Sequence, residues 1–422
     1  MRQPRSAGYR SAVDADVVVV GAGLAGLRCA AALVEAGREV VVLEAADAVG
    51  GRIRTDRVDG FLVDRGFQLL NPAYPAVRRW VDVDALGLQA FGAGVVAATE
   101  QGRVMLGHPL REPGLLPGTL ASTLTRPGEV LGLLRWVAPL LRPHRGPLAR
   151  VLEAHDDVAR GEALDRAGAR GVLRRVVDGF LAGVLLEDDG STADRFALLL
   201  VSSFLRGVPA LPAEGMQALP EQLARPLGAR VRLGHRVTAV GRSQVSTTEG
   251  TWRAPHVVVA TDAGAAHGLT GVEARATKGV VTVWWSAKRT ESSDLLHVDA
   301  RARPTGPLVN TAVVSDAAPS YAPPDRHLVQ GSALLGPGRV VEEPAMRRHA
   351  AELLGADARG WEVVARHEVP DALPAQPPPF TTARPVRVGD VVVCGDHRDT
   401  GSIQGALVSG QRAADAVLAG TA

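Results

Sequence analysis

The sequence predicts an α/β fold in which two domains are interleaved along the chain. Its 422 residues exceed what one ordinary hydrophobic core accommodates. A strand–helix–strand pattern occupies residues 16–44, and a strand, a glycine-containing turn and a helix occupy residues 390–418. Further strand patterns lie between residues 231 and 260. Because strands joined through a helix run parallel, one domain is expected to gather distant segments around a parallel sheet.

The composition excludes several classes of protein. Apolar residues make up 46% and charged residues 22% of the chain, which rules out global disorder. The 47 basic and 45 acidic residues give a net charge of +2, which argues against a nucleic-acid binder. Two cysteines, Cys29 and Cys394, are too few for a disulfide framework or a multi-thiolate metal site, and the histidines lack HxxxH or HExxH spacing. We expect a cytoplasmic protein without a metal.

No secretory or membrane-spanning segment is predicted. Residues 1–15 are polar and basic without an apolar core. The most apolar stretch, residues 17–36, contains Arg28 and several glycines, which do not suit a spanning helix. Residues 129–152 mix leucines with Trp136 and several arginines. We expect a proline-interrupted helix of a substrate domain there, with peripheral contact to a membrane surface as the alternative.

The opening unit combines two strands, a helix and a glycine-rich turn. Residues 16–20 and 39–44 are short β-branched runs typical of buried strands, and residues 24–36 have the alanine-rich spacing of a helix. Gly21, Gly23 and Gly26 form GxGxxG at the start of this helix. The first glycine makes the tight turn, the second lets the backbone approach a pyrophosphate, and the third allows close helix–strand packing. The helix N-terminus supplies N–H donors to the phosphates.

Two features after this turn strengthen a dinucleotide assignment. Glu44 ends the second strand, where an acidic side chain accepts hydrogen bonds from a ribose. Residues 50–55 (GGRIRT) follow directly, and their paired glycines expose backbone amides. Arg52 can add positive charge to the same diphosphate. Together these residues predict a Rossmann-like dinucleotide-binding domain.

The rest of the chain is expected to contain helices in its first half and mainly strands in its second half. Residues 76–205 look mostly helical, and the texture changes to strands from about residue 210. The expected elements are helices at 172–186, 197–205 and 221–227, strands at 231–233, 236–240, 256–260 and 280–285, an extended proline-rich crossing segment at 370–385, a strand at 390–394 and a helix from about 402 to 418.

Several motifs resemble those of one superfamily. Residues 50–55 resemble the GGR-x-x-[ST] extension, and residues 391–406 resemble the closing flavin motif, of FAD-dependent oxidoreductases in the amine oxidase, phytoene desaturase and protoporphyrinogen oxidase superfamily, with a desaturase-like bacterial texture. Residues 64–68, 214–237 and 257–262 are similar to further segments of these proteins. The resemblance implies non-covalent FAD in a glutathione-reductase-type domain. It implies cofactor contacts by Gly21, Gly23, Leu24, Ala25, Gly26, Glu44, Ala45, Gly50, Gly51, Arg52, Gly66, Phe67, Gln68, Val237, Ala260, Thr261, Gly395, Asp396, Ser402 and Ile403.

The motif positions divide the chain into two domains. The FAD-binding domain is expected to comprise residues 13–75, 210–265 and 385–422. An α+β substrate-binding domain is expected to comprise residues 76–209, mostly helical, and 266–384, with a sheet. The flavin and a small-molecule substrate are expected to lie between them, because ligand sites concentrate at domain interfaces. The oligomeric state is left open.

The chain departs from amine oxidases in its candidate substrate residues. Those proteins present aromatic side chains opposite the flavin, whereas this chain has only three tyrosines and no matching tyrosine pair near its end. Lys278 is the candidate for their lysine beside the flavin, with Lys288 as the other lysine. His397 follows the flavin motif and is a second candidate to face the substrate.

The expected activity is oxidation by flavin. A hydride would move from a C–H bond of a small to medium apolar substrate, an isoprenoid-like alkene or an amine, to flavin N5, and oxygen or another acceptor would reoxidise the flavin. No second dinucleotide motif is present for a pyridine nucleotide. Two alternatives use the same fold: a redox-neutral flavin-dependent isomerase or mutase, and a non-catalytic prenyl-binding protein. The second predicts a degraded nucleotide site, whereas Gly21, Glu44 and Arg52 are present.

Overall fold

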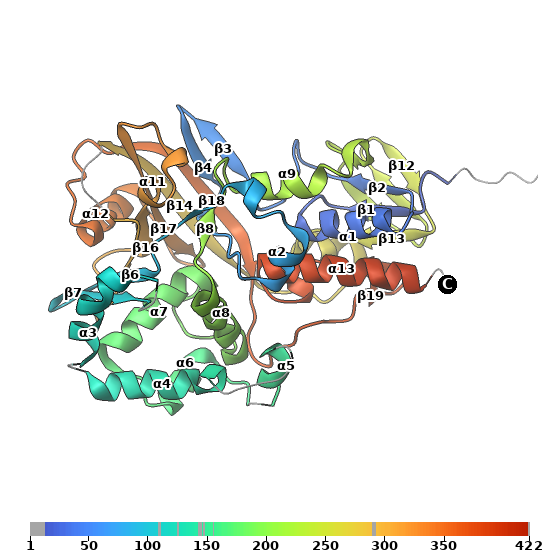
Figure 1. Ribbon diagram of the computed structural model, residues 1–422. Coiled ribbons are helices and arrows are strands. Elements are labelled where there is room, and N and C mark those ends of the chain that lie inside the picture. Colours follow the sequence, from blue (N-terminus) through green and yellow to red (C-terminus); the bar gives the residue numbers. More distant parts are fainter. Residues whose placement is uncertain are drawn as a thin grey trace, which may run out of the picture.

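A computed structural model describes residues 13–108, 111–124, 126–141, 146, 148–154, 156–288 and 293–420. Figure 1 shows two parts side by side, one with the opening and closing helices and one with the long strands and most other helices. In the first part the described strands form a six-stranded sheet in the order β19-β20-β13-β1-β2-β9. Its strands are β1 (Val17–Val20), β2 (Val40–Leu43), β9 (Val231–Arg232), β13 (His256–Val259), β19 (Arg387–Val388) and β20 (Val391–Val393).

This sheet confirms the predicted parallel arrangement of distant segments. β1 pairs in parallel with β2 and β13, and β13 pairs in parallel with β20. β19 is the antiparallel edge strand beside β20. The strands therefore come from both ends and the middle of the chain, as expected. The domain boundaries themselves stay predictions.

Two helices cover one face of this sheet, and three antiparallel strands with one helix cover the other face. Val17 and Val19 pack with α1 (Leu24–Glu35) and α13 (Ile403–Ala419). Val18 and Val20 point to the other face because successive side chains of a strand alternate. That face is covered by the antiparallel strands β10 (Val237–Val240), β11 (Gln244–Thr247) and β12 (Gly250–Arg253) and by α10 (Ala263–Thr270).

The second part is built on a mixed sheet. Among the described residues it has seven strands in the order β18-β14-β17-β16-β15-β6-β7. These are β6 (Gly94–Thr99), β7 (Gly102–Gly107), β14 (Thr277–Lys288), β15 (Leu296–Asp299), β16 (Leu308–Val313), β17 (Arg326–Leu335) and β18 (Glu362–Pro374). Two small antiparallel pairs, β3 (Thr55–Val58) with β4 (Phe61–Asp64) and β5 (Gln89–Ala90) with β8 (Ala210–Leu211), lie outside both sheets.

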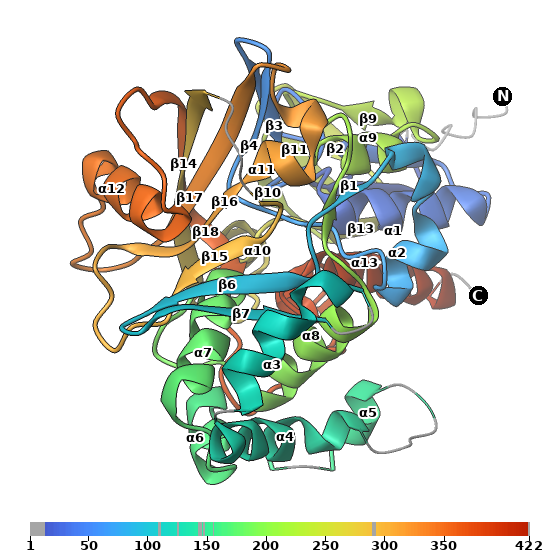
Figure 2. The same cartoon turned by 60° about the vertical axis from the view of Figure 1, so that its left-hand side comes forward.

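Most of the remaining helices gather on one side of the β6–β7 hairpin (Figures 1 and 2). Those in this group are α3 (Leu116–Leu124), α4 (Pro127–Leu141), α5 (Leu148–Leu152), α6 (Arg160–Arg166), α7 (Gly171–Leu185) and α8 (Asp194–Arg206). The others are α2 (Pro75–Trp80), α9 (Ala218–Ala224), α11 (Val314–Ala317) and α12 (Glu343–Leu354), besides single 3₁₀ turns at Asp84–Leu86, Pro113–Leu115, Gly228–Arg230, Pro319–Tyr321 and Asp396–Arg398.

The fold corrects one expectation from sequence. Residues 94–107 form the β6–β7 hairpin inside a stretch that was expected to be mostly helical. Besides β7, β6 pairs with β15, a strand distant in sequence, and this pairing completes its backbone hydrogen bonds. Of the proline-rich segment at 370–385, which was expected to be extended, the first part continues β18 as far as Pro374 and pairs with β14.

The candidate membrane-surface segment 129–152 covers most of α4 and all of α5. Residues 142–145 and 147 lie outside the described part of the chain, as do residues 1–12 of the polar and basic stretch at 1–15. α4 exposes Leu131, Leu134 and Leu141 to solvent. Among the described helices none combines the length and the hydrophobicity that crossing a bilayer requires. Contact with a membrane surface stays a prediction.

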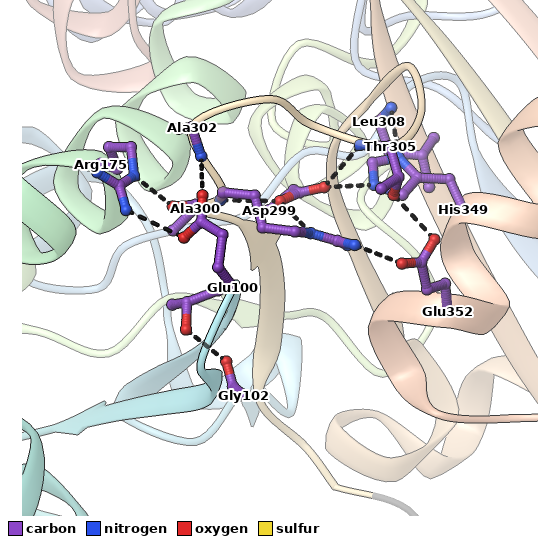
Figure 3. A network of polar contacts seen from close by, with 12 residues as sticks. Glu100, Gly102, Arg175, Asp299, Ala300, Ala302, Thr305, Leu308, His349 and Glu352 are labelled. Carbon is purple, nitrogen blue, oxygen red and sulfur yellow. Dashed lines mark hydrogen bonds and ion pairs between the residues drawn. The ribbon is translucent and has the colours of Figure 1, made fainter.

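A polar network at the end of β15, an interior strand of the second sheet, fixes the chain that follows this strand (Figure 3). Asp299 accepts hydrogen bonds from Nε2 of His349 (3.0 Å) and Nε of Arg301 (2.9 Å). Arg301 also pairs with Glu352 of α12, and Glu100 in the β6–β7 turn accepts from the backbone N–H of Ala302 (2.6 Å). Burial acts to raise the pKa of Asp299, but these hydrogen bonds hold it well below its ordinary value. The network joins β15, α12 and the hairpin.

Candidate cofactor and substrate site

A cavity of about 890 Å³ lies where the two parts meet. It begins at the ends of β1, β2 and β13 and continues between α7, α8 and the second sheet. Of the twenty predicted cofactor residues all but Gly26 line it, namely Gly21, Gly23, Leu24, Ala25, Glu44, Ala45, Gly50, Gly51, Arg52, Gly66, Phe67, Gln68, Val237, Ala260, Thr261, Gly395, Asp396, Ser402 and Ile403. Residues scattered over the whole chain are therefore brought to one surface, although their contacts with FAD stay predictions.

The three glycines of the opening turn have different surroundings. Gly21 has φ +101°, which a side chain would strain. A Cβ on Gly26 would lie 2.0 Å from the carbonyl oxygen of Gly21, so Gly26 serves close packing and lies behind the cavity. A Cβ on Gly23 would meet nothing within 4 Å and would project into open space. Gly23 also caps α1 without any side-chain acceptor, which leaves the first N–H groups of that helix for an anion. This cradle fits a pyrophosphate.

Glu44 is held in place by backbone donors. Its Oε2 accepts from the N–H of Ala22 (2.7 Å) and its Oε1 from the N–H of Ala46 (2.8 Å). The carboxylate thus bridges the glycine turn and the chain after β2 while it lines the cavity. Two oxygens that each accept one bond keep lone pairs for ribose hydroxyls.

Arg52 and Asp396 form an ion pair inside the cavity wall. Nη2 of Arg52 lies 2.7 Å from Oδ2 of Asp396, and Nη1 of Arg52 donates to the carbonyl oxygen of Ala372 (2.7 Å). The GGR loop and the closing motif, which were predicted to contact FAD separately, are therefore bonded to each other. Gln68 adds a third tie, because its Nε2 donates to the carbonyl oxygen of Arg52 (3.0 Å).

The start of α13 supplies further donors at this wall. Ser402 caps the helix and accepts from the N–H of Gly405, and both Ser402 and Ile403 line the cavity. The positive end of the helix dipole thus lies where the resemblance puts the flavin pyrimidine, which gains negative charge on reduction. Cys394 is fully buried and is not among the described lining residues, in keeping with a flavin held without a covalent bond.

The far part of the cavity is apolar and aromatic. Phe67 and Phe91 meet edge to face with ring centroids 5.8 Å apart, and Phe180 of α7 meets Phe204 of α8 in the same way at 5.1 Å. All four line the cavity, out of seven phenylalanines in the chain. More than half of the phenylalanines are thus concentrated at this site. We call this part, lined by the two phenylalanine pairs with Val184 and Leu200, the substrate compartment.

Lys278 does not line the cavity. Its Nζ bonds to Oε2 of Glu187 and to Oγ1 of Thr192, both at 2.8 Å. The pairing of β14 with β18 shifts register between Lys278 and Val280, and Val280 is the side chain that reaches the cavity from this stretch. No lysine is present among the described residues that line the cavity. The geometry therefore does not support Lys278 as the lysine beside the flavin.

His397 is also outside the cavity wall. Its side chain is buried, and neither ring nitrogen has a hydrogen-bond partner. Burial lowers the pKa of His397 to about 4, so the imidazole is neutral at physiological pH. A Cβ on Gly395 would lie 2.5 Å from this ring, which places His397 behind the closing motif. The geometry gives it a packing role and does not bring it to the substrate.

The residues that sequence analysis missed are those of the substrate compartment. Phe180, Gly183 and Phe204 come from helices, and Asn310 and Ser332 come from the second sheet. None belongs to a local motif, so no short pattern marks them. The carboxylates among the described lining residues, Glu44, Asp262 and Asp396, all belong to the predicted cofactor segments. The described residues of the metal-binding types form no cluster of three or more that could hold a metal ion.

Known proteins resemble this chain in sequence and in fold. Putrescine oxidase of Kocuria rosea is 31% identical over 251 residues, 55% of this chain and 50% of that protein. The putative flavin-containing monoamine oxidase AofH of Mycobacterium tuberculosis is 30% identical over 273 residues, 58% of this chain and 56% of that protein. This chain thus spans about half the length of the curated relatives it matches.

Solved structures match over almost the whole chain. Wild-type putrescine oxidase bound to putrescine has a TM-score of 0.69 at 20% identity, covering 96% of this chain and 99% of that one. A putative protoporphyrinogen oxidase from Exiguobacterium sp. 255-15 has a TM-score of 0.69 at 17% identity, covering 95% and 98%. These likenesses show the fold. The family model described as flavin containing amine oxidoreductase matches residues 24–418. The chain therefore belongs to the flavin-containing amine oxidoreductase family.

Proposed function

We propose that this protein is an FAD-dependent oxidoreductase that oxidises an amine with an apolar body and a single amino group. The observation that carries the proposal is one cavity that joins the dinucleotide cradle to a phenylalanine-lined compartment. FAD, when bound, supplies the two-electron acceptor for converting the C–H bond beside the amine nitrogen into an imine, and oxygen or another acceptor then takes the electrons.

The chain contributes burial and alignment to this reaction. The amine must be neutral to react, because a protonated nitrogen has no lone pair to assist loss of the neighbouring hydrogen. Transfer of an ammonium into apolar surroundings lowers its pKa and so favours the neutral form. The walls formed by Phe67, Phe91, Phe180 and Phe204 provide such surroundings. The proposal therefore needs neither Lys278 nor His397.

The charges around the cavity favour a monoamine. A diamine or an amino acid would carry a second charge into the substrate compartment, where burial of an unpaired charge is costly. Glu44 and Asp396 are engaged in the cofactor half, and Arg65 is paired with Asp56 (2.9 Å). The other charged side chains among the described lining residues, Arg52, Arg236 and Asp262, belong to predicted cofactor segments. The compartment walls themselves offer uncharged polar groups, such as Asn310 and Ser332.

Three other functions can be compared with amine oxidation at the same cavity. An isoprenoid-like alkene would suit the apolar walls equally, and the amine is favoured because putrescine oxidase and AofH are named as amine oxidases. A prenyl-binding protein would not need the cradle at Gly23 or the Glu44 carboxylate. A redox-neutral isomerase would need FAD but no electron acceptor, so turnover without oxygen consumption distinguishes it.

Anaerobic reduction of the purified holoenzyme tests the proposal. Monoamines with alkyl or arylalkyl bodies should bleach the oxidised flavin absorbance, whereas putrescine and amino acids at the same concentration should bleach it at least tenfold more slowly, the factor expected for one unpaired buried group. Bleaching by isoprenoid alkenes but by none of the amines would contradict the amine assignment. Bleaching by putrescine as fast as by monoamines would contradict the single-charge argument.

A further inference from the structure

A chain of buried polar side chains crosses the second sheet and ends at the cavity. Thr282 on β14, Ser332 and Gln330 on β17, and Asn310 on β16 are each at most 5% exposed. Oγ1 of Thr282 lies 2.9 Å from Oγ of Ser332, Oγ of Ser332 donates to Oε1 of Gln330 (3.2 Å), and Nε2 of Gln330 donates to Oδ1 of Asn310 (3.1 Å). We call these four residues the sheet relay.

The relay runs in one direction. Ser332 has a single hydroxyl hydrogen and gives it to Gln330, so Thr282 must be the donor in the bond between the two hydroxyls. Gln330 uses its carboxamide oxygen to accept and its nitrogen to donate. The carboxamide oxygen of Asn310 is therefore occupied, and its NH₂ group is the free end. Among the described residues none accepts a hydrogen bond from Nδ2 of Asn310, and this atom is not fully enclosed by protein, so it faces the open space of the cavity.

Gly183 makes room for this free end. A Cβ on Gly183, in α7, would lie 2.1 Å from Nδ2 of Asn310, so the NH₂ group sits directly against the helix at a glycine. Both residues line the cavity beside Phe180. A second asparagine at the cavity, Asn71, differs: its Nδ2 donates to the carbonyl oxygen of Ser203 (3.0 Å) and its Oδ1 accepts from the N–H of Ala73 (2.9 Å). Both polar atoms of the Asn71 side chain are therefore bonded to the backbone, whereas the NH₂ group of Asn310 has no such bond.

We propose that Asn310 is a specificity-determining residue that donates a hydrogen bond to an uncharged oxygen on the substrate. The substrate class would be an apolar molecule that carries a carbonyl, ether or hydroxyl oxygen in addition to its reacting group. This inference rests on the proposed function only in assigning the compartment to the substrate. A ligand that fills the compartment covers this donor, and a covered donor without an acceptor is costly, so ligands that supply an acceptor should be selected over those that do not.

Equilibrium binding to the oxidised holoenzyme tests the proposal without any turnover. The probes are an arylalkyl methyl ketone, 4-phenylbutan-2-one, and its isosteric alkene, in which C=CH₂ replaces C=O. Dissociation constants come from the perturbation of the flavin absorption spectrum. The wild type should bind the ketone about tenfold more tightly than the alkene, the preference expected for one satisfied buried donor.

Two variants and a control locate the preference. Asn310→Leu removes the donor, and Gly183→Ala keeps the relay but displaces Nδ2, so each should bring the ratio of the two dissociation constants close to one. Asn71→Leu changes the size of the cavity wall without touching a free donor and should keep the wild-type ratio. A melting curve for each variant confirms that it is folded, and either one of the first two suffices if the other does not fold.

The contradicting results are equally specific. Equal affinity for ketone and alkene in the wild type, no detectable ketone binding, or an unchanged ratio in Asn310→Leu and Gly183→Ala would each overturn the role of Asn310. Failure of the proposed amine oxidation would show instead as a flavin that no amine bleaches. Because neither probe contains an amino group, the two failures are separate.

Discussion

Arg52 and Asp396 form a 2.7 Å ion pair that joins the first cofactor loop to the closing motif of the chain. Asp396 is buried, and one third of the Arg52 side chain is exposed toward the cavity (33%). The pair fixes two cavity walls that belong to opposite ends of the sequence. It therefore organises the site before any cofactor contact is made.

Arg52→Gln should weaken FAD binding. The substitution leaves the buried carboxylate of Asp396 without its cation and loosens the contact with Ala372. We expect the dissociation constant for FAD to rise by a factor of about 10–100, the range for a lost hydrogen bond to a charged group. Quenching of FAD fluorescence during titration of the apoprotein measures it. Arg57→Gln, which breaks an exposed pair with Glu214, is the control and should leave FAD affinity unchanged.

Two glycines of the same turn should separate binding from folding. Gly23→Ala adds a methyl group that meets no protein atom within 4 Å, so the melting temperature of the apoprotein should stay the same while FAD affinity falls. Gly26→Ala places its methyl group 2.0 Å from the Gly21 carbonyl oxygen and should cost about 1–3 kcal/mol in the free energy of unfolding. Unaltered FAD affinity in Gly23→Ala would show that the cradle does not hold the pyrophosphate.

Lys278→Met should affect stability and leave the flavin chemistry intact. Glu187 is buried and would lose one of its two cations, the ammonium 2.8 Å from its Oε2, while Arg160 stays 3.4 Å from its Oε1. Because one cation remains, the loss should be smaller than the roughly 3 kcal/mol of a buried pair broken outright, and the midpoint of urea unfolding should fall. Lys288→Met at the exposed end of β14 is the control. A slower reductive half-reaction in Lys278→Met with unchanged stability would instead place Lys278 at the flavin.

The carboxyl of Asp64 should make stability depend on pH. It accepts from Oγ1 of Thr55 (2.5 Å), the N–H of Met216 (3.1 Å) and the hydroxyl of Tyr321 (3.0 Å), with no cation in contact, and burial raises its pKa to about 6. Because the folded pKa lies above the ordinary 3.8, its contribution is full below about pH 4 and is lost as pH rises through about 6.

Asp64→Asn removes this titration and keeps the shape of the side chain, since the Tyr321 hydroxyl can turn to accept. Urea unfolding midpoints of wild type and variant, measured at pH 5 and pH 8, report the effect. The variant should gain relative to the wild type at the higher pH by about 1.4 kcal/mol, because only about one of the two pKa units of the shift lies above pH 5. A relative loss at the higher pH would reverse the sign and contradict the raised pKa.

The cofactor half of the site was predictable because its chemistry is local in sequence. GxGxxG, GGR and the closing turn each put backbone amides and one charged residue within a few positions, so the pattern names the ligand before the fold is known. Glu44 and Asp396 follow strands of a parallel sheet, whose carboxyl ends converge on one edge. The structure adds what no motif contained, namely that Arg52 and Asp396 bond to each other.

The substrate half was not predictable, because each of its residues is ordinary in its own segment. Phe180 and Phe204 look like core positions of amphipathic helices, and Asn310 lies in a strand that is buried at all but one position. The position of Lys278 outside the cavity was not predictable either, because its side chain bonds to Glu187, a partner 91 residues away, and a register shift lies next to it. The positions of these side chains depend on contacts between segments that are distant in sequence, and residue spacing within one segment does not predict such contacts.

The measurement that tests the central claim most directly is anaerobic titration of the purified protein with an arylalkyl monoamine while the flavin spectrum is recorded. The account predicts a yellow protein whose FAD is released by denaturation, and complete bleaching of its absorbance by one equivalent of amine per flavin. A colourless protein that takes up no added FAD, or a bound flavin that stays oxidised with every monoamine, would contradict it.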